Sequence, residues 1–297
     1  MQVWVEVLIP HYRDPAGLKA SLESLKRQTW NGRLVALVVD DGSPEDDWQA
    51  AQTVCAESGL EVRLIRQAEN LGRPRTRNRL LAEARAPWLA WLDSGDIWYS
   101  NKLAVQFSYL ARLVRQGANP ERLWVTCAYD WDQNGQRRAI RQQVGGDQLR
   151  ELLRGDRLRA YLWTLLGSAQ AFRAAGLFDE RLPRLQDLDY FVNFVRGGGT
   201  IVTPPGGKPL CRYYKSDVGR NAVEVRDSNH LILDKLAPLT VRYGRAFQAG
   251  ARFKAEMLAA RFAANNGKRW MRLVCLMRAA WVSPSAMTRA IVRKVSR

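Results

Sequence analysis

The stretch LVALVVDDGS, residues 34–43, decides the fold class, because six apolar residues run directly into two acids and a turn. A short, continuous apolar run is typical of a strand buried on both faces of a parallel sheet. Ser43 and Pro44, followed by three acids at residues 45–47, predict a helix with a capping hydroxyl at its start. The stretch therefore predicts strand, polar turn and helix, the first part of a βαβ unit.

The same alternation continues on both sides of this stretch. We predict strands at residues 5–9, 62–65 and 87–92 and helices at residues 18–28 and 75–85. Short apolar strands that alternate with helices indicate a mostly parallel sheet flanked by helices, and hence an α/β fold. Ligands of such sheets bind at the carboxyl ends of the strands. The polar residues that follow the strands are therefore the first candidates for a functional site.

The rest of the chain is less regular and becomes helical toward its end. Asn134-Gly135 predicts a tight hairpin turn and therefore some antiparallel pairing. From about residue 222 onward the pattern is that of a helical C-terminal extension. The predicted elements are helices at residues 103–114 and 185–195, strands at 124–129, 200–203 and 210–214, and helix breaks at Pro238, Gly250, Gly267 and Pro284.

The composition is that of a folded protein with a basic tail. The chain has 297 residues, 46% of them hydrophobic and 25% charged, which argues against a disordered or fibrous protein. Its net charge is +17, and residues 216–297 hold 16 Lys and Arg against 5 Asp and Glu, a net charge of +11. The basic excess therefore describes a partner of the tail more than the chemistry of the first 215 residues.

The cysteines and histidines exclude two classes of site. The four cysteines lie 64 or more residues apart and there are two histidines, so we expect neither a zinc cluster nor a secreted disulfide framework. This pattern fits a reducing compartment, and we predict a cytoplasmic protein. The first ten residues are typical of a strand, not a signal peptide, and no run of about 18 uncharged apolar residues predicts a membrane span.

Two pairs of acids follow predicted strands. Asp40 and Asp41 are either binding residues or ordinary turn residues. Asp93 and Asp96, three residues apart after an apolar strand, suit a hard divalent cation that also takes phosphate oxygens. A turn is the alternative there as well.

A third candidate feature is basic. Arg73, Arg75, Arg77 and Arg79 surround the predicted start of a helix. Guanidinium groups at a helix N-terminus form a good receptor for a diphosphate. The alternative is a solvated basic face of the helix.

In combination, these elements resemble the family-2 glycosyltransferases of the GT-A fold across about residues 3–108. The resemblance rests on several spaced motifs that occur in the right order. A weaker likeness continues at residues 176–180 and 186–189, and none is visible past about residue 215. The motifs are Pro10-His11-Tyr12, residues 18–30, VVDDGS at 38–43, Asn70-Leu71-Gly72, Arg77-Asn78, WLDSGDIW at 91–98 and Lys102-Leu103.

The resemblance implies an enzyme with a GT-A-like fold, a glycosyltransferase that moves a sugar from a nucleotide-sugar to an acceptor hydroxyl with inversion at the anomeric carbon. It implies a catalytic domain at residues 1–215, followed by the basic helical extension at residues 216–297. Within the catalytic domain, residues 1–110 would be the nucleotide-sugar-binding half and residues 111–215 the acceptor-side half.

The resemblance also implies roles for individual residues. Asp187 would be the general base that takes the proton of the acceptor hydroxyl. Asp41, with Asp40 beside it, would accept a hydrogen bond from the nucleotide base. The implied nucleotide-sugar-binding residues are Pro10, Tyr12, Asp40, Asp41, Arg73, Arg77 and Asp93.

Two positions depart from the family's pattern. The family commonly has its direct metal ligand at the third position of an Asp-x-Asp motif, and that position is Gly95 here. Asp93 and Asp96 are then the candidate ligands of Mg²⁺ or Mn²⁺, and the arginines near residues 73–77 would carry more of the diphosphate charge. Gln186 stands where the family often has Glu, which leaves Asp187 itself in place.

The expected partners are a nucleotide-sugar donor, with a UDP-sugar favoured, and a glycan or lipid-linked acceptor. The expected acceptor rests on an analogy with family members that synthesise cell-envelope polysaccharide or lipopolysaccharide. Trp98 and Tyr99, which follow the second acid pair, are candidates for stacking on an acceptor sugar, whereas Trp88 and Trp91 are expected in the core.

Two alternatives from other classes stay open. A nucleic-acid-binding protein would use the net charge of +17, but most of that charge lies in the tail and no binding motif is present, so we expect no nucleic acid partner. A nucleotidyltransferase would share the strand-end acids, but residues 10–14 are not the glycine-rich basic loop that it usually has after the first strand.

Residues 268–282 of the tail combine apolar residues at three- and four-residue steps with basic margins. Two interpretations are open. The helix packs on the catalytic domain, as most amphipathic helices do, or it lies in a membrane interface with its cations on anionic lipid. The second would hold the protein peripherally on the inner face of the cytoplasmic membrane, near a lipid-linked acceptor.

Overall fold

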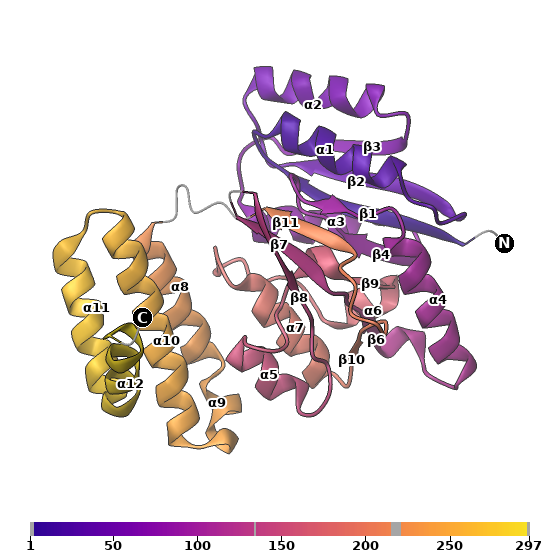
Figure 1. Ribbon diagram of the computed structural model, residues 1–297. Helices are drawn as coiled ribbons and strands as arrows, with labels where there is room; N and C mark the ends of the chain where they lie inside the picture. The colour runs from indigo at the N-terminus through magenta and orange to yellow at the C-terminus, as the bar shows by residue number, and fades with distance from the viewer. Residues whose placement is uncertain (1–2, 134, 215–220, 296–297) are drawn as a thin grey trace. The chain divides into compact units, whose positions relative to one another are not determined.

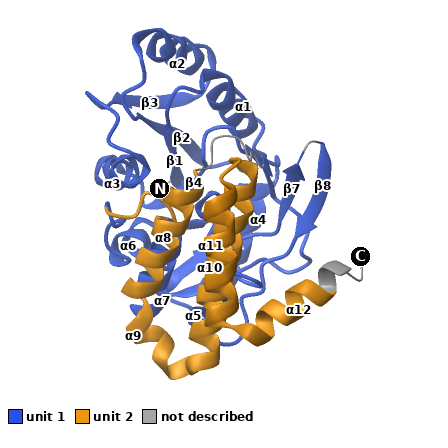
Figure 2. Cartoon of the chain, turned by 90° about the vertical axis from the view of Figure 1, so that its left-hand side faces the viewer, with its two compact units in different colours: residues 1–180, 187–216 blue, residues 181–186, 217–297 orange. Residues whose placement is uncertain are grey.

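The computed structural model describes residues 3–133, 135–214 and 221–295. The chain divides into two compact units, which Figure 2 shows in different colours. Unit 1 comprises residues 1–180 and 187–216, and unit 2 comprises residues 181–186 and 217–297.

Unit 1 is built on a seven-stranded sheet, which is mostly parallel as predicted (Figure 1). Its strands are β1 (Trp4–His11), β2 (Arg33–Asp40), β3 (Glu61–Arg66), β4 (Trp88–Trp91), β6 (Leu123–Val125), β9 (Leu166–Ser168) and β10 (Thr200–Val202). The strand order is β10-β6-β9-β4-β1-β2-β3, with β9 antiparallel to β4 and β6 and the other pairs parallel. His11 pairs with Asp40, so β1 and β2 end at the same edge.

The helices of unit 1 cover both faces of this sheet. They are α1 (Pro15–Lys26), α2 (Glu45–Glu57), α3 (Arg73–Glu83), α4 (Lys102–Arg115), α5 (Gln148–Arg154), α6 (Ala169–Ala174) and α7 (Gln186–Arg196), whose first residue belongs to unit 2. Val7 of β1 packs in one cluster with Leu22 of α1. Glu6 points to the opposite face, where it accepts hydrogen bonds from the backbone N–H groups of Arg85 and Ala86, just after α3.

A second sheet of four strands adds the antiparallel pairing that the sequence predicts. Its strands are β5 (Ile97–Trp98), β7 (Tyr129–Gln133), β8 (Gln136–Ile140) and β11 (Cys211–Tyr214), in the order β5-β11-β7-β8. The chain turns between β7 and β8 at Gly135, which has a φ of +81°, while Asn134 lies outside the described residues. The strand predicted at residues 124–129 is divided between β6 and β7.

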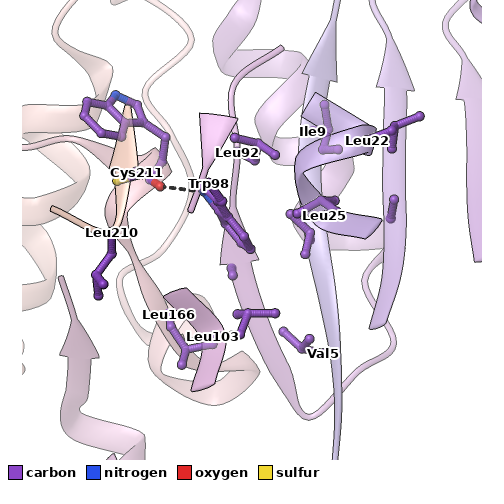
Figure 3. Packing of buried hydrophobic residues seen from close by; sticks show 14 of the residues in the cluster. Val5, Ile9, Leu22, Leu25, Leu92, Trp98, Leu103, Leu166, Leu210 and Cys211 are labelled. Atoms are coloured by element: carbon purple, nitrogen blue, oxygen red, sulfur yellow. Dashed lines mark hydrogen bonds between the residues drawn. The ribbon is translucent and has the colours of Figure 1, made fainter. Parts of the chain in front are cut away.

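The core of unit 1 lies between the sheets and their helices (Figure 3). Trp98 is buried in it beside Leu103, and its indole N–H donates to the carbonyl oxygen of Trp163 at 3.2 Å. Two 3₁₀ turns precede strands of the larger sheet, η1 (Pro120–Arg122) before β6 and η2 (Leu162–Thr164) before β9. All four cysteines of the chain are buried free thiols, as expected for small apolar residues.

Unit 2 is helical, as predicted for the C-terminal extension. Its elements are α8 (Ala222–Lys235), α9 (Ala237–Thr240), the 3₁₀ turn η3 (Val241–Tyr243), α10 (Arg245–Asn265), α11 (Arg269–Val282) and α12 (Pro284–Val295). The helix break predicted at Gly250 is wrong, because that residue lies inside α10. One glycine costs a helix about 1 kcal/mol, and α10 offsets this by packing its alanines, Ala259 and Ala263 among them, against both neighbouring helices.

Helix α11 has two apolar faces, which the sequence pattern did not separate. Cys275 and Ala279 are buried, and Cys275 packs with alanines of α10. A second row remains exposed, with Trp270 at 74%, Leu273 at 48%, Met277 at 52% and Trp281 at 88% of their full surface. No helix in the described part of the chain is both long and apolar enough to cross a bilayer.

Candidate active site

A cavity of about 390 Å³ opens at the carboxyl ends of β1, β2 and β4. This is where ligands of parallel sheets bind. Its walls come from the segment after β1, the turn after β2, the start of α3 and the turn after β4. The lining residues are Pro10, His11, Tyr12, Asp14, Asp41, Asn70, Gly72, Arg73, Thr76, Asp93 and Ser94. The structure thus brings together five of the predicted nucleotide-sugar residues, namely Pro10, Tyr12, Asp41, Arg73 and Asp93.

Asp41 holds two walls of the cavity together. Its Oδ1 accepts hydrogen bonds from the backbone N–H of Leu71 at 2.8 Å and from the amide of Gln67 at 2.6 Å, and its Oδ2 accepts one from Gly72 at 3.0 Å. Gly42 makes this approach feasible, because a Cβ there would lie 2.2 Å from the backbone of Glu69. With a φ of +67°, this position also favours glycine over other residues.

Asp40 is fully buried beside the cavity and does not line it. Its two oxygens accept from the backbone N–H of Ser43 at 2.9 Å and from the Ser43 hydroxyl at 2.6 Å. Ser43 is therefore not the helix cap that the sequence predicts, since Pro44 stands at the cap position and no side chain caps α2. Asp40 fixes the turn on which Asp41 sits.

His11 and Arg13 shape the end of β1. His11 lines the cavity with its ring 3.8 Å from Asp40, and burial lowers the pKa of His11 while the charge of Asp40 opposes that change. Arg13 has a φ of +53°, a strained conformation for a residue with a side chain, and its N–H donates to Ser43 at 2.9 Å. This backbone conformation lets the chain turn sharply between β1 and α1.

The second acid pair is divided between the cavity and the interior. Asp93 lines the cavity and its side chain is 33% exposed, whereas Asp96 is buried and accepts a hydrogen bond from the N–H of Tyr214 at 3.3 Å. Burial, followed by the charge of Asp93, raises the pKa of Asp96 well above its usual range. Gly95 forms the turn between them with a φ of +93°.

The two acids offer hard oxygen donors to a divalent cation. Oδ2 of Asp96 is buried without a hydrogen-bond partner among the described residues, which fits a carboxylate built to meet a further ligand. No group of three His, Cys, Asp or Glu side chains in the described ranges gathers in a metal-binding arrangement.

Arg77 lies outside the cavity wall and links two candidate residues. It is 1% exposed, and its guanidinium donates to Asp93 at 3.0 Å on one side and to Asp187 on the other. Burial raises the pKa of Asp187, and the charge of Arg77 opposes that rise. The sequence thus identified the members of this cluster, but it assigned Arg77 to the diphosphate and did not foresee the double ion pair.

The expectation for Trp98 is wrong, because this side chain is 2% exposed and cannot stack on a sugar. The Lys102 ammonium lies 3.8 Å from its ring centroid. Tyr99 donates from its hydroxyl to Asp130 at 2.5 Å. Trp91 is buried in the core, as expected.

Several residues of the site were given no role of their own by the sequence analysis. Asp14 and Ser94 line the cavity, and Asp14 also caps α1 by accepting from the N–H of Gly17 at 2.9 Å. An N-cap pattern before Pro15 could have pointed to Asp14. Asn78 binds the backbone of Phe178, a contact across 100 residues that no local pattern predicts.

A mostly parallel sheet with a polar cavity at the carboxyl ends of its strands places the protein among the α/β proteins that bind a ligand at this edge. Against known proteins, the family model "Glycosyl transferase family 2" matches residues 6–173, more than half of the chain. The chain belongs to glycosyl transferase family 2. Among the three classes that the sequence left open, the match supports the glycosyltransferase.

Two curated relatives show what the chain resembles. One is the amylovoran biosynthesis glycosyltransferase AmsB of Erwinia amylovora, 32% identical over 113 residues, or 37% of each chain. The other is the UDP-Glc:alpha-D-GlcNAc-diphosphoundecaprenol beta-1,3-glucosyltransferase WfgD of Escherichia coli, 28% identical over 108 residues, or 36% of this chain and 41% of that protein. The chain spans less than half the length of either relative.

Two solved structures share the fold. S. aureus TarS, solved in complex with UDP-GlcNAc, has a TM-score of 0.60 at 14% identity. The similarity covers 94% of this chain and 91% of the TarS chain. The mannosyltransferase PcManGT from Pyrobaculum calidifontis, solved with GDP-Man and Mn²⁺, has a TM-score of 0.56 at 18% identity. The similarity covers 98% of this chain and 79% of the PcManGT chain. Both similarities support the GT-A-like architecture of the chain.

Proposed function

We propose that the protein transfers a sugar from a nucleoside-diphosphate sugar to an acceptor hydroxyl with inversion at the anomeric carbon. One observation carries the proposal: the strand-end cavity and the carboxylate of Asp187 are joined through a single buried side chain, Arg77. A donor in the cavity would then lie beside a base that can receive the proton of the attacking hydroxyl. The catalytic domain is proposed to be residues 1–215, with a nucleotide-sugar-binding half at 1–110 and an acceptor-side half at 111–215.

In this proposal the acceptor oxygen attacks the anomeric carbon while its proton passes to Asp187 and the nucleoside diphosphate leaves. A sugar hydroxyl is a poor nucleophile, so a positioned carboxylate lowers the barrier. Asp187 lies in the first turn of α7, on the far side of Arg77 from the donor-side Asp93. This separation suits a base that serves the acceptor and not the donor.

A UDP-sugar is the favoured donor, because the relative WfgD is named for UDP-Glc and the structural neighbour TarS was solved with UDP-GlcNAc. Pro10, Tyr12 and Asp41 are proposed to contact the nucleoside, and Arg73, at the start of α3, the diphosphate. Asp40 would serve by holding the turn of Asp41.

We propose that Asp93, with Asp96 behind it, holds Mg²⁺ or Mn²⁺. The support is the unpartnered buried oxygen of Asp96, together with the Mn²⁺ complex of the neighbour PcManGT. When bound, the cation supplies positive charge to the leaving diphosphate.

The acceptor is proposed to be a glycan or a lipid-linked sugar of cell-envelope polysaccharide synthesis, and the protein to lie peripherally on an anionic membrane of the cytoplasm. WfgD is named for a diphosphoundecaprenol acceptor, and AmsB for amylovoran synthesis. The exposed row of α11 supports the membrane surface, since two tryptophans and two aliphatic side chains face solvent there. Nine Lys and Arg and no Asp or Glu follow Glu256, which suits anionic lipid.

A thermal-shift screen with UDP, GDP, ADP and CDP, each with and without Mn²⁺, tests the proposal. Ligand binding to the folded state raises the melting temperature by mass action, so we expect UDP to give the largest rise. Hydrolysis of the matching UDP-sugar, or its transfer to a polyprenyl-diphosphate sugar, would then follow by mass spectrometry. If no nucleoside diphosphate changes the melting temperature, the cavity is not a donor site.

A further inference from the structure

Helix α3 binds Phe178 and Glu180, which precede Asp187 in the chain. Asn78 holds the backbone of Phe178 from both sides: its amide donates to the carbonyl oxygen at 3.1 Å, and its own oxygen accepts from the N–H at 2.8 Å. One turn earlier, Arg75 pairs with Glu180 at 2.8 Å. These partners lie 100 or more residues further along the chain. The helix therefore fixes the backbone that leads toward the candidate base.

Arg77 completes this set of contacts through its charge. Its guanidinium is buried between Asp187 and Asp93 and lies 5.7 Å from the ring centroid of Phe178. A planar guanidinium can hold two carboxylates at once at fixed angles, which a point charge cannot do. The spacing between the donor-side acid and the candidate base is thus set by one rigid group.

The N-terminal turn of the same helix belongs to the cavity. Gly72, Arg73 and Thr76 line it, and the N–H of Gly72 is bound by Asp41. The first turn of α3 therefore lines the cavity, while Arg77 and Asn78 bind Asp187 and Phe178. The two sets of contacts come from consecutive turns of one helix, in which Arg77 directly follows Thr76.

We propose that Arg77 is a positioning residue, which holds Asp187 at a fixed distance from the donor, and that Asn78 supports it by fixing the backbone at Phe178. The inference rests on the proposed function, in which Asp187 is the base. It assigns Arg77 a role different from diphosphate binding, because the guanidinium is buried away from the cavity wall and spends its hydrogen bonds on carboxylates.

The two roles of Arg77 predict opposite kinetics. Arg77→Lys keeps the positive charge but cannot hold both carboxylates in one plane. A misplaced base lowers kcat, and a misplacement on the order of 1 Å costs up to about 10²-fold. We therefore expect kcat to fall at least about 10-fold, with UDP affinity by calorimetry and the donor KM changed less than about 3-fold. Arg79→Lys is the matched control, since this exposed arginine of α3 pairs with Glu83 of its own helix.

A double-mutant cycle tests whether Arg77 acts through Asp187. In the Asp187→Asn background, Arg77→Lys should produce almost no further loss of kcat, because the group that it positions is already gone. Additive losses would overturn the proposal, and so would an Arg77→Lys variant that loses UDP affinity while its kcat is unchanged. If Asp187→Asn alone keeps full kcat, the assignment of the base fails instead, which separates the two failures.

Asn78→Ala covers the case in which Arg77→Lys does not fold, since removing one partner of a buried ion pair can cost several kcal/mol. The expected result is a lower kcat with unchanged UDP affinity and a cooperative thermal transition. Wild-type kcat in folded Asn78→Ala, or weakened UDP binding in its place, would contradict the positioning role of α3.

Discussion

At the scale of single residues, the site depends on where each carboxylate is placed. Asp187, Asp93 and Asp41 are all ionisable side chains near one cavity, yet their surroundings differ. Asp41 is bound by backbone N–H groups, Asp93 and Asp187 share one arginine, and burial raises the pKa of Asp187. Substitutions at these positions should therefore produce distinguishable defects.

Asp187→Asn should keep UDP binding and lose transfer, because it removes the base without changing the shape of the side chain. We expect kcat to fall by roughly 10²-fold or more, measured as sugar transfer at saturating donor. In the wild type, the base works only when ionised, so activity should fall as the pH is lowered through the raised pKa of Asp187. Asp156→Asn, an exposed acid paired with Arg154, is the control. An unchanged kcat in Asp187→Asn would refute the assignment.

Asp41→Ala should weaken UDP binding by about 1–3 kcal/mol, the cost of leaving buried donors without an acceptor. The loss of affinity has two sources: the nucleoside loses its contact with Asp41, and the N–H groups of Leu71 and Gly72 at the cavity wall lose their acceptor. Isothermal calorimetry measures it. Asp46→Ala, an exposed acid at the start of α2, should bind UDP like the wild type. Equal affinities for both variants would move the nucleotide to another part of the surface.

At the scale of elements, two turns and one helix decide how the site responds to ligands. The turn between β4 and β5 carries the acid pair, with Gly95 between them and the buried Asp96 beneath β11. The turn after β2 carries Asp41. Helix α3 lines the cavity with its first turn and binds the carboxylate of Asp187 and the backbone of Phe178.

The acid turn predicts a weak metal site. With Asp93 and Asp96 as the protein ligands and glycine at the third position of the motif, we expect transfer to require Mg²⁺ or Mn²⁺ and to saturate at a relatively high concentration. Asp96→Asn keeps the shape of the side chain but removes a carboxylate ligand of the cation, so the metal concentration for half activity should rise. A titration of activity against MnCl₂ gives the value. Full activity in EDTA would mean that the arginines at residues 73–77 neutralise the leaving group alone.

At the scale of the whole molecule, the distribution of charge and apolar surface points to a partner larger than a sugar. The net charge of +17 is concentrated in the helical tail, and α11 exposes four large apolar side chains in a row. Helix α11 also packs on α10 through its other face, so the exposed row is presented by a folded unit.

Trp270→Ser with Trp281→Ser should abolish binding to vesicles that contain anionic phospholipid, since the two indoles are the largest side chains of the exposed row. Each surface cation adds about 1 kcal/mol, so wild-type binding should weaken as salt rises. Co-sedimentation at low and high salt measures both effects. Val241→Ser removes an exposed apolar residue outside α11 and should pellet like the wild type. Wild-type protein that stays in the supernatant at low salt would contradict the membrane surface.

The sequence by itself determined the parts of this protein that depend on neighbours along the chain. Apolar runs and helical spacing predicted β1 to β4 and α1 to α4 to within a few residues, because burial and periodicity are local properties. The order of the motifs predicted the family, and the turns after β2 and β4 predicted which acids to examine. Gly250 misled the prediction, because one glycine is weighed locally but the packing of α10 is not.

Tertiary structure alone decided which of these residues meet. The sequence placed Arg77 in a basic run and Asp187 110 residues away, and only the fold buries them against each other. Trp98 stood next to the acids in sequence but became part of the core, because β5 joins the second sheet and turns its indole inward. Packing on α10 likewise decided which apolar residues of α11 are buried and which remain exposed. Contacts between distant segments follow from how elements pack, and packing depends on the whole chain at once.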